Sequence, residues 1–459
     1  MSTAIQARFD LGEPTWAGRH CSIGRRRLAL RLCQGMVLLP LFSLVLLPEY
    51  VQGLGDAETK SMVYWATAGP LRMVDVLLLG MIAVHGLVWA SSRRLRVSIP
   101  RELLLPGLGF LTAIALSMIY GALHGGSNLF FDWRALALGT GLYGVFALWL
   151  QSERARDWAI RWFAGYMALR IAMIYVEFVR GGGDVIVGMR IPVFDGPTLS
   201  AIVFTGVLGL CMCDAARSRL EALAWMGLSG GAYLLVLLCF RRTFWAELGT
   251  ATLLLLLAQK HGRSRKLLLA GASFMVVAAM LGPAFYERMQ SMDFTRDESE
   301  FSQGNPDHVG EVMDAWEQVR RAPVVGIGMG RSFPTTRITE WKEESVMVHN
   351  APLHVWLKYG LLGLVCYVWF HAAVLRRLWR SQRASRSGAQ RPFLCRPEDG
   401  EAETEAFHHS ITGFTAAALV YVAAQFAVSL GFAPWPYSSV QSTTLTAFVL
   451  AVAMREARP

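Results

Sequence analysis

His349 and Asn350 stand where a long polar segment gives way to an apolar one, in the stretch VMVHNAPLHVWLKYGLLGL over residues 346–364. An imidazole can take up or release a proton near neutral pH. A polar group at a membrane boundary must also find partners, because burying it without a hydrogen bond is unfavourable. The pair therefore indicates proton-handling chemistry beside a bilayer. The plainer alternative is a histidine that only begins a helix at the interface.

Arginines in two further segments could bind an anion. Arg190 lies in GGGDVIVGMRIPVFDG over residues 181–196, where glycines and a Val/Ile run predict a short extended or re-entrant piece. Arg241 and Arg242 lie in LCFRRTFWAEL, a tight turn between two apolar runs. Guanidinium groups bind phosphate oxygens bidentately, so these side chains predict a phosphate-bearing substrate. The alternative for the adjacent pair is contact with lipid phosphates.

Apolar runs of membrane-spanning length recur along nearly the whole chain of 459 residues, which is 54% hydrophobic and only 17% charged. They predict an all-α integral membrane protein of about twelve transmembrane helices. The expected spans are 33–53, 66–90, 102–124, 134–151, 157–178, 197–214, 222–240, 243–259, 266–286, 350–374, 409–431 and 437–454.

The positive charge follows the same plan. Basic residues cluster in alternate short loops, at 25–27, 93–96, 154–161, 217–219, 260–266 and 376–396. Loops rich in Lys and Arg stay in the cytoplasm, so both termini are expected inside. The net charge of +10 is therefore explained by the basic cytoplasmic loops that orient the protein in the membrane. Nucleic acid is not expected as a partner.

The expected organisation follows from the spans. It comprises a cytoplasmic tail (1–32), nine transmembrane helices (33–286), a large periplasmic loop (287–349), a tenth helix (350–374), a cytoplasmic loop (375–408) and two last helices (409–454). The cytoplasmic loop is rich in Arg and Ser and then acidic, which predicts a flexible, solvated segment.

The large outer loop contains one predicted helix. GEVMDAWEQVRRAP places Val312, Trp316 and Val319 on one side, and Pro323 ends the helix. The following VVGIGMGRSF lacks the strand-turn-helix unit of a nucleotide-binding loop. Its glycines instead predict a tight turn, or a close approach of backbone to a ligand.

No metal or other cofactor is expected. His354 lies five residues after His349, about 140° around a helix, so the two rings do not share a face. His354 is expected to pack among helices. The acidic residues Glu340, Glu343 and Glu344 are read as a solvated face, with one of them as a catalytic base as the alternative.

Together these residues resemble the bacterial O-antigen ligases and the related O-antigen and exopolysaccharide polymerases, which are C-type membrane glycosyltransferases. His349 and Asn350, followed by Gly360 and Gly363, resemble the family's histidine-asparagine signature and its Gly-x-x-Gly element. Pro323 to Gly328 resembles a preceding Pro-x-x-Gly-x-Gly element, and Arg242 resembles an arginine that opens a span. The large outer loop is similarly placed. One departure is that HVGEVMDAW lacks the arginine that the family often carries before this tryptophan; Arg288, Arg320 and Arg321 are the candidates to replace it.

The resemblance implies a metal-independent glycosyltransferase at the periplasmic face of the bacterial inner membrane. Its donor would be a glycan on undecaprenyl diphosphate, and its acceptor a hydroxyl of lipid A-core in a ligase or of another glycan in a polymerase. His349 would accept the hydroxyl proton or bind the diphosphate, and Asn350 would orient His349 or cap the helix that follows. Arg190, Arg241 and Arg242 would hold the diphosphate, with Arg288 or Arg321 in support.

Two hypotheses from other classes remain. A secondary transporter or lipid flippase would carry charges near the middle of the membrane and broken helices in both halves. Arg72, Asp75 and Arg170 are the candidates for such charges. A non-catalytic assembly subunit has no specific support. The twelve-span layout favours a ligase over a polymerase, and the sugar is not identified.

Overall fold

The computed structural model describes residues 71–91, 100–186, 189–192, 196–258, 269–276, 304–337, 347–388, 399–430 and 439–454. It also describes short pieces between residues 38 and 68, residues 279, 282 and 286, and residues 344–345. The predictions for Arg288, Glu340 and Glu343, and about half of each of the spans 33–53 and 266–286, lie outside the described residues.

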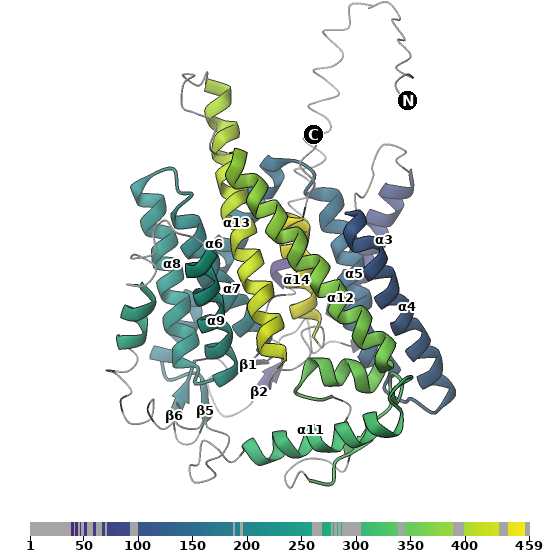
Figure 1. The fold of residues 1–459 in the computed structure, drawn as a ribbon. Helices are drawn as coiled ribbons and strands as arrows, with labels where there is room; N and C mark the ends of the chain where they lie inside the picture. The colour runs from purple at the N-terminus through teal and green to yellow at the C-terminus, as the bar shows by residue number, and fades with distance from the viewer. Residues whose placement is uncertain are drawn as a thin grey trace, which may run out of the picture.

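The described chain is built mainly from helices (Figure 1). Their bounds are α3 (Met73–Ser91), α4 (Arg101–Leu123), α5 (Leu129–Trp149), α6 (Glu153–Val179), α7 (Gly196–Cys213), α8 (Arg219–Leu238), α9 (Arg242–Ala258), α11 (Gly304–Arg321), α12 (Ala351–Gly388), α13 (Asp399–Ser429) and α14 (Val440–Ala453). The predicted spans from 102–124 to 243–259 each coincide with one helix to within a few residues.

Six of the described helices are long and apolar enough to cross a membrane: α4, α6, α7, α8, most of α12 and the apolar part of α13. Shorter apolar helices lie at Met73–Leu87 and Val440–Ala453. The protein is therefore a multi-pass, predominantly α-helical membrane protein.

Helix α7 lies at the centre of the bundle, and 83% of its apolar window is buried. It packs on α8, α9, α13 and α14. Small residues bring α7 and α8 close together: Ser229 Oγ donates to the Gly206 carbonyl over 2.7 Å, and a Cβ at Gly209 would lie 2.7 Å from the Trp225 carbonyl oxygen. Close contact through small residues is how helices associate in membranes, where lipid is as apolar as the helices.

Serine side chains begin three of the helices. Ser152 accepts from Ala155 N at the start of α6, Ser218 from Glu221 N at α8, and Ser439 from Ser442 N at α14. Each hydroxyl satisfies one of the backbone N–H groups that a first turn leaves without an intrahelical partner.

Short antiparallel hairpins connect some helices. Two are β1 (Tyr50–Gln52) with β2 (Glu58–Lys60), and β5 (Asp184–Ile186) with β6 (Met189–Ile191). The others are β3 (Thr67–Ala68) with β4 (Leu71–Arg72), and β7 (Phe333–Pro334) with β8 (Glu344–Ser345). The hairpin β5–β6 confirms the extended piece predicted within residues 181–196.

The prediction of a span over 66–90 is wrong at its start, because β3 occupies residues 67–68, β4 occupies residues 71–72, and the helix begins at Met73. Asp75 explains the boundary. Its buried carboxylate accepts from Arg72 N over 2.9 Å and pairs with Arg134 of α5 over 3.3 Å. Asp75, one of the three charges that the transporter hypothesis named, thus takes part in a structural ion pair between α3 and α5.

The predicted flexible loop 375–408 is shorter in the structure. Helix α12 continues to Gly388, and α13 begins at Asp399. Arg380 of this extension pairs with Glu102 of α4, which supports the added turns. Helix α12 is interrupted at Gly360, whose φ of 68° and ψ of −173° are not helical.

One end of the bundle carries the segments that the sequence singles out. Figure 1 shows α11 lying across the lower end, with the start of α12 above it and the hairpin β5–β6 at the same end. Because α7 runs away from this end and α8 returns to it, the turn between α8 and α9 lies there too.

Candidate active site

Helix α11 presents His308 and Glu311 on one face, because residues three apart are neighbours on a helix surface. The helix is held on the bundle by Ala315 and Val319, which pack in one apolar cluster with Leu353 and Leu357 of α12. Glu311 shares this inner face and is only 3% exposed. The predicted amphipathic helix is thus confirmed, and its inner face carries a carboxylate. Of the predicted apolar side, Val319 is buried and Val312 packs against the cluster, but Trp316 is 45% exposed.

His349 directly precedes α12, and Asn350 caps that helix. Asn350 Oδ1 accepts from Leu353 N over 2.9 Å, and its Nδ2 donates to the Leu430 carbonyl at the end of α13 over 3.1 Å. Capping is therefore the role observed for Asn350, among the two that the sequence allowed. The neighbouring Val348 is fully buried in the cluster under α11, so the backbone at His349 is fixed from both sides.

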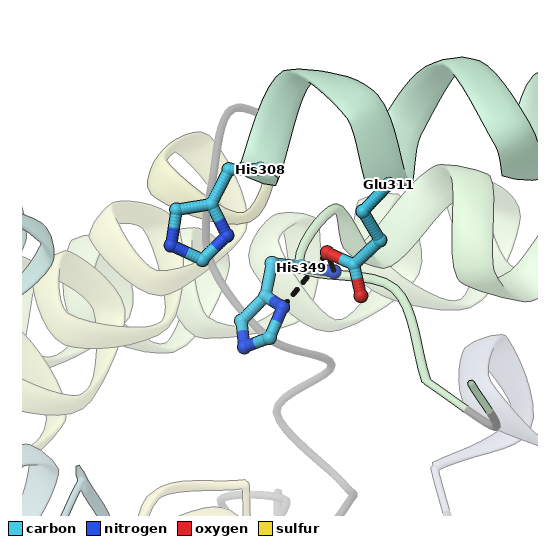
Figure 2. A group of neighbouring side chains, drawn as sticks. All are labelled: His308, Glu311 and His349. Atoms are coloured by element: carbon cyan, nitrogen blue, oxygen red, sulfur yellow. Dashed lines mark hydrogen bonds and ion pairs between the residues drawn. The ribbon is translucent and has the colours of Figure 1, made fainter. Parts of the chain in front are cut away.

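Glu311 and His349 form a hydrogen-bonded pair (Figure 2). Glu311 Oε2 lies 2.8 Å from His349 Nδ1 and 3.1 Å from His349 N. Burial opposes ionisation of this carboxyl group, but hydrogen bonds from His308 and His349 prevail and lower the pKa of Glu311 to about 2. An ionised carboxylate only accepts hydrogen bonds, so Nδ1 carries a proton in this contact, and in the neutral form of the ring Nε2 holds the lone pair.

His308 completes the group. Its ring lies edge-on to that of His349, with 4.8 Å between the ring centroids. Figure 2 shows both rings and the Glu311 carboxylate pointing toward one another. One nitrogen of each ring and a carboxylate oxygen all lie within 4.8 Å of one another, a spacing that could hold a metal ion.

The glycine-rich segment after α11 docks into the break in α12. Leu361 N donates to the carbonyls of Pro323 and Val324, each over 3.1 Å, and Ile327 N donates to the Leu357 carbonyl over 2.7 Å. A Cβ at Gly360 would lie 2.0 Å from the Val324 carbonyl oxygen. The predicted tight turn is confirmed. The close approach that the glycines allow is between two segments of the protein's own backbone, at Val324 and Gly360.

A buried ion pair between Lys358 and Asp132 holds the glycine-rich segment against the start of α12. Lys358 is 0% exposed, and its Nζ donates to Asp132 Oδ2 of α5 over 3.1 Å and to the Arg331 carbonyl. Asp132 Oδ2 also accepts from Gly330 N over 2.7 Å. Ser117 of α4 donates to the Lys358 carbonyl over 2.6 Å and accepts from Met329 N over 3.0 Å. The start of α12 is thereby tied to α4 and α5.

The predicted arginines occupy two sites at the same end of the bundle. Arg190 lies on β6, opposite Val185 in the hairpin register. Arg241 and Arg242 are half-buried at the start of α9, after Phe240, whose φ of 53° makes the turn from α8 tight. Trp245 Nε1 donates to the last carbonyls of α8, those of Val236 and Leu237, and so fixes this turn.

Arg321 stands apart from the pair of Glu311 and His349. It is exposed and pairs with Glu317 one turn earlier on α11. Ten residues separate it from Glu311, which corresponds to about 15 Å along a helix axis. No contact in the described residues supports Arg321 as the replacement for the missing loop arginine. Arg288, the other candidate, lies outside the described residues.

Glu311 and Lys358 are the residues that sequence reasoning missed. Glu311 lies in the predicted amphipathic helix, four residues before Ala315 and eight before Val319, so it falls on the apolar face. Lys358 is a charge inside the predicted span 350–374. Both residues could have been found in the sequence, because each is a charged residue at a position that the surrounding apolar residues place in the interior. His354, by contrast, is buried as expected, at 7% exposure.

Residues 204–368 match the family model described as O-Antigen ligase. The matched range runs from within α7 to within α12, and it contains the arginine turn before α9, the helix α11 and His349. No curated protein matches the chain. The match supports the resemblance to O-antigen ligases and polymerases, a family that acts on lipid-linked glycans in a membrane. Residues 204–368 of this multi-pass membrane protein are thus similar to the O-Antigen ligase family model.

Proposed function

We propose that the protein is an O-antigen ligase-type glycosyltransferase. It moves a glycan from undecaprenyl diphosphate to a sugar hydroxyl of lipid A-core, at the periplasmic face of the bacterial inner membrane. The observation that carries this proposal is the contact between Glu311 Oε2 and His349 Nδ1 over 2.8 Å. A buried carboxylate that holds an imidazole in one tautomer leaves the other ring nitrogen ready to accept a proton.

In the proposed reaction, the acceptor hydroxyl oxygen attacks the anomeric carbon of the donor glycan. The hydroxyl proton passes to His349 Nε2, and the bond between the anomeric carbon and the diphosphate oxygen breaks. The imidazolium that forms is stabilised by the Glu311 carboxylate, which is ionised because its pKa lies near 2. The lipid diphosphate leaves with the bonding electron pair, and no metal is required for these steps.

The arginines are assigned to the leaving group. A lipid diphosphate gains negative charge as its bond to the sugar breaks, and fixed guanidinium groups stabilise that charge. Arg190, Arg241 and Arg242 support this assignment because their segments share one end of the bundle with His349 (Figure 1).

Replacing His349 by alanine should lower kcat by about 10²–10⁴-fold, the usual contribution of a general base. The assay uses purified full-length protein in detergent with an undecaprenyl-diphosphate glycan and lipid A-core. The matched control is His124→Ala, since His124 is an exposed histidine at the end of α4 whose ring bonds the Tyr120 carbonyl and contacts the Tyr120 ring. Transfer by His349→Ala at the wild-type rate would rule out the proposed base.

The same assay separates the two roles open to His349. A general base acts in the chemical step, so its loss lowers kcat and leaves the KM for the donor nearly unchanged. A ligand of the diphosphate contributes to donor binding, so its loss raises that KM. The product separates ligase from polymerase: a ligase attaches glycan once to lipid A-core, whereas a polymerase yields a ladder of lengths on the lipid carrier.

Arg242→Ala and Arg190→Ala should each reduce kcat/KM for the donor by about 10–100-fold, as expected for loss of one charge-assisted contact worth about 1.5–3 kcal/mol. Arg321→Ala is the control, because the exposed Arg321 pairs with Glu317 on the outer side of α11. Unchanged kinetics for Arg242→Ala and Arg190→Ala, with normal yields of folded protein, would assign those arginines to lipid contact.

A further inference from the structure

The face of α11 above His349 has the composition of a transition-metal site. His308 and Glu311 are three residues apart on one helix face, and His349 meets them from the start of α12. Their donor atoms all lie within 4.8 Å of one another. Two imidazoles and one carboxylate are the ligand set of several zinc sites that keep one coordination position open.

The donor atoms lie within 4.8 Å of one another and would have to rearrange to accept an ion. Zinc lies about 2.0–2.2 Å from nitrogen and oxygen ligands, so donors of a tetrahedral site stand about 3.3 Å apart. Glu311 Oε2 and His349 Nδ1 are 2.8 Å apart and would have to open slightly. The approach to tetrahedral spacing falls to the histidine rings, which are partly buried, whereas Glu311 is held in the interior.

The ligand types decide which ion fits. Magnesium and calcium prefer sites made of oxygen donors, whereas imidazole nitrogens favour zinc and its neighbours in the first transition row. The ion would coordinate His349 through Nδ1, with the ring proton on Nε2, so the imidazole stays neutral. Glu311 supplies the negative charge that a divalent ion requires.

We infer that His308, Glu311 and His349 form a binding site for one divalent transition-metal ion of the zinc type. The ion takes the place of the Glu311–His349 hydrogen bond. It moves the ring proton of His349 to the nitrogen that, in the function proposed above, accepts the hydroxyl proton. Metal binding and glycan transfer at His349 therefore exclude each other, and zinc acts as an inhibitor. The inhibition by zinc rests on the proposed function, whereas the metal site itself does not.

The test uses the purified full-length protein without a polyhistidine tag, titrated with Co²⁺ as a spectroscopic substitute for zinc. The expected result is one Co²⁺ per chain, with ligand-field absorption bands that one equivalent of Zn²⁺ removes. His308→Ala and Glu311→Gln should weaken binding by more than the 10–100-fold that loss of an outer-shell partner typically costs. Circular dichroism and thermal unfolding without metal establish that both variants fold.

His124→Ala is the control, because it removes a histidine outside the group and should leave Co²⁺ binding unchanged. Absence of the bands in the wild type, or equal binding by His308→Ala and Glu311→Gln, would overturn the site. Glycan transfer is followed in the same titration. We expect glycan transfer to fall in proportion to Co²⁺ occupancy. If Co²⁺ binds and transfer is unchanged, the metal site is supported but proton transfer to His349 is contradicted.

Discussion

Replacing Glu311 by glutamine should lower kcat for glycan transfer by about 10²–10⁴-fold and leave the KM for the donor nearly unchanged. Glutamine has almost the shape of glutamate but no charge, and it can turn its NH₂ group toward His349 Nδ1. The ring would then carry its proton on Nε2, the nitrogen that has to accept one. The imidazolium formed during transfer would also lose its counter-ion, which lies 2.8 Å away in the native protein.

Asp314→Asn is the matched control for this prediction. Asp314 lies one turn after Glu311 on α11, is 3% exposed, and accepts from Thr336 N over 2.8 Å and from Arg337 N over 3.1 Å. Its removal should loosen the turn at residues 336–337 and lower the stability of the protein, with kcat retained. Equal kcat losses in the two variants would mean that Glu311 acts only through the structure of α11.

Replacing Lys358 by methionine should lower the free energy of unfolding by about 3–5 kcal/mol, because it leaves the partner carboxylate uncompensated. Methionine has a similar length and suits the apolar surroundings of a fully buried side chain. Asp132 would lose its cation and the Arg331 carbonyl its donor. Unfolding in mixed detergent micelles, followed by circular dichroism, measures the change.

The double variant Asp132→Asn/Lys358→Met separates charge from packing. Asparagine removes the uncompensated charge, and its side-chain oxygen can still accept from Gly330 N. The double variant should therefore be more stable than Lys358→Met alone. If it is equally unstable, the loss comes from packing at position 358 and the ion pair contributes little.

The membrane helices were the part of the fold that the sequence predicts best. The spans at 102–124 and 197–214 coincide with α4 and α7 because a long apolar run in a membrane has one favourable structure, a helix with all its backbone bonds internal. The start at residue 66 was wrong because apolar composition does not distinguish a hairpin from a helix. That boundary depends on the pairing of Asp75 with Arg134, which lies 59 positions away and is invisible to a local pattern.

The candidate site was predicted only in part. His349 and Asn350 stood out because they are adjacent and polar at the edge of an apolar run. Glu311 did not, since its partner His349 lies 38 residues away and a charge on an amphipathic helix is normally assigned to solvent. The hydrogen bonds that join α11 to the start of α12 exist only once both helices are in place.

The contacts of Lys358 also bear on how the protein is made. Lys358 bonds Asp132 across 226 residues of sequence and Ser117 across 241. Helices α4 and α5 are therefore synthesised long before α12, and until then the Asp132 carboxylate lacks its bond to Lys358. Assembly of the site is consequently a late, long-range step of biogenesis, completed only when α12 inserts and Gly360 receives the glycine-rich segment.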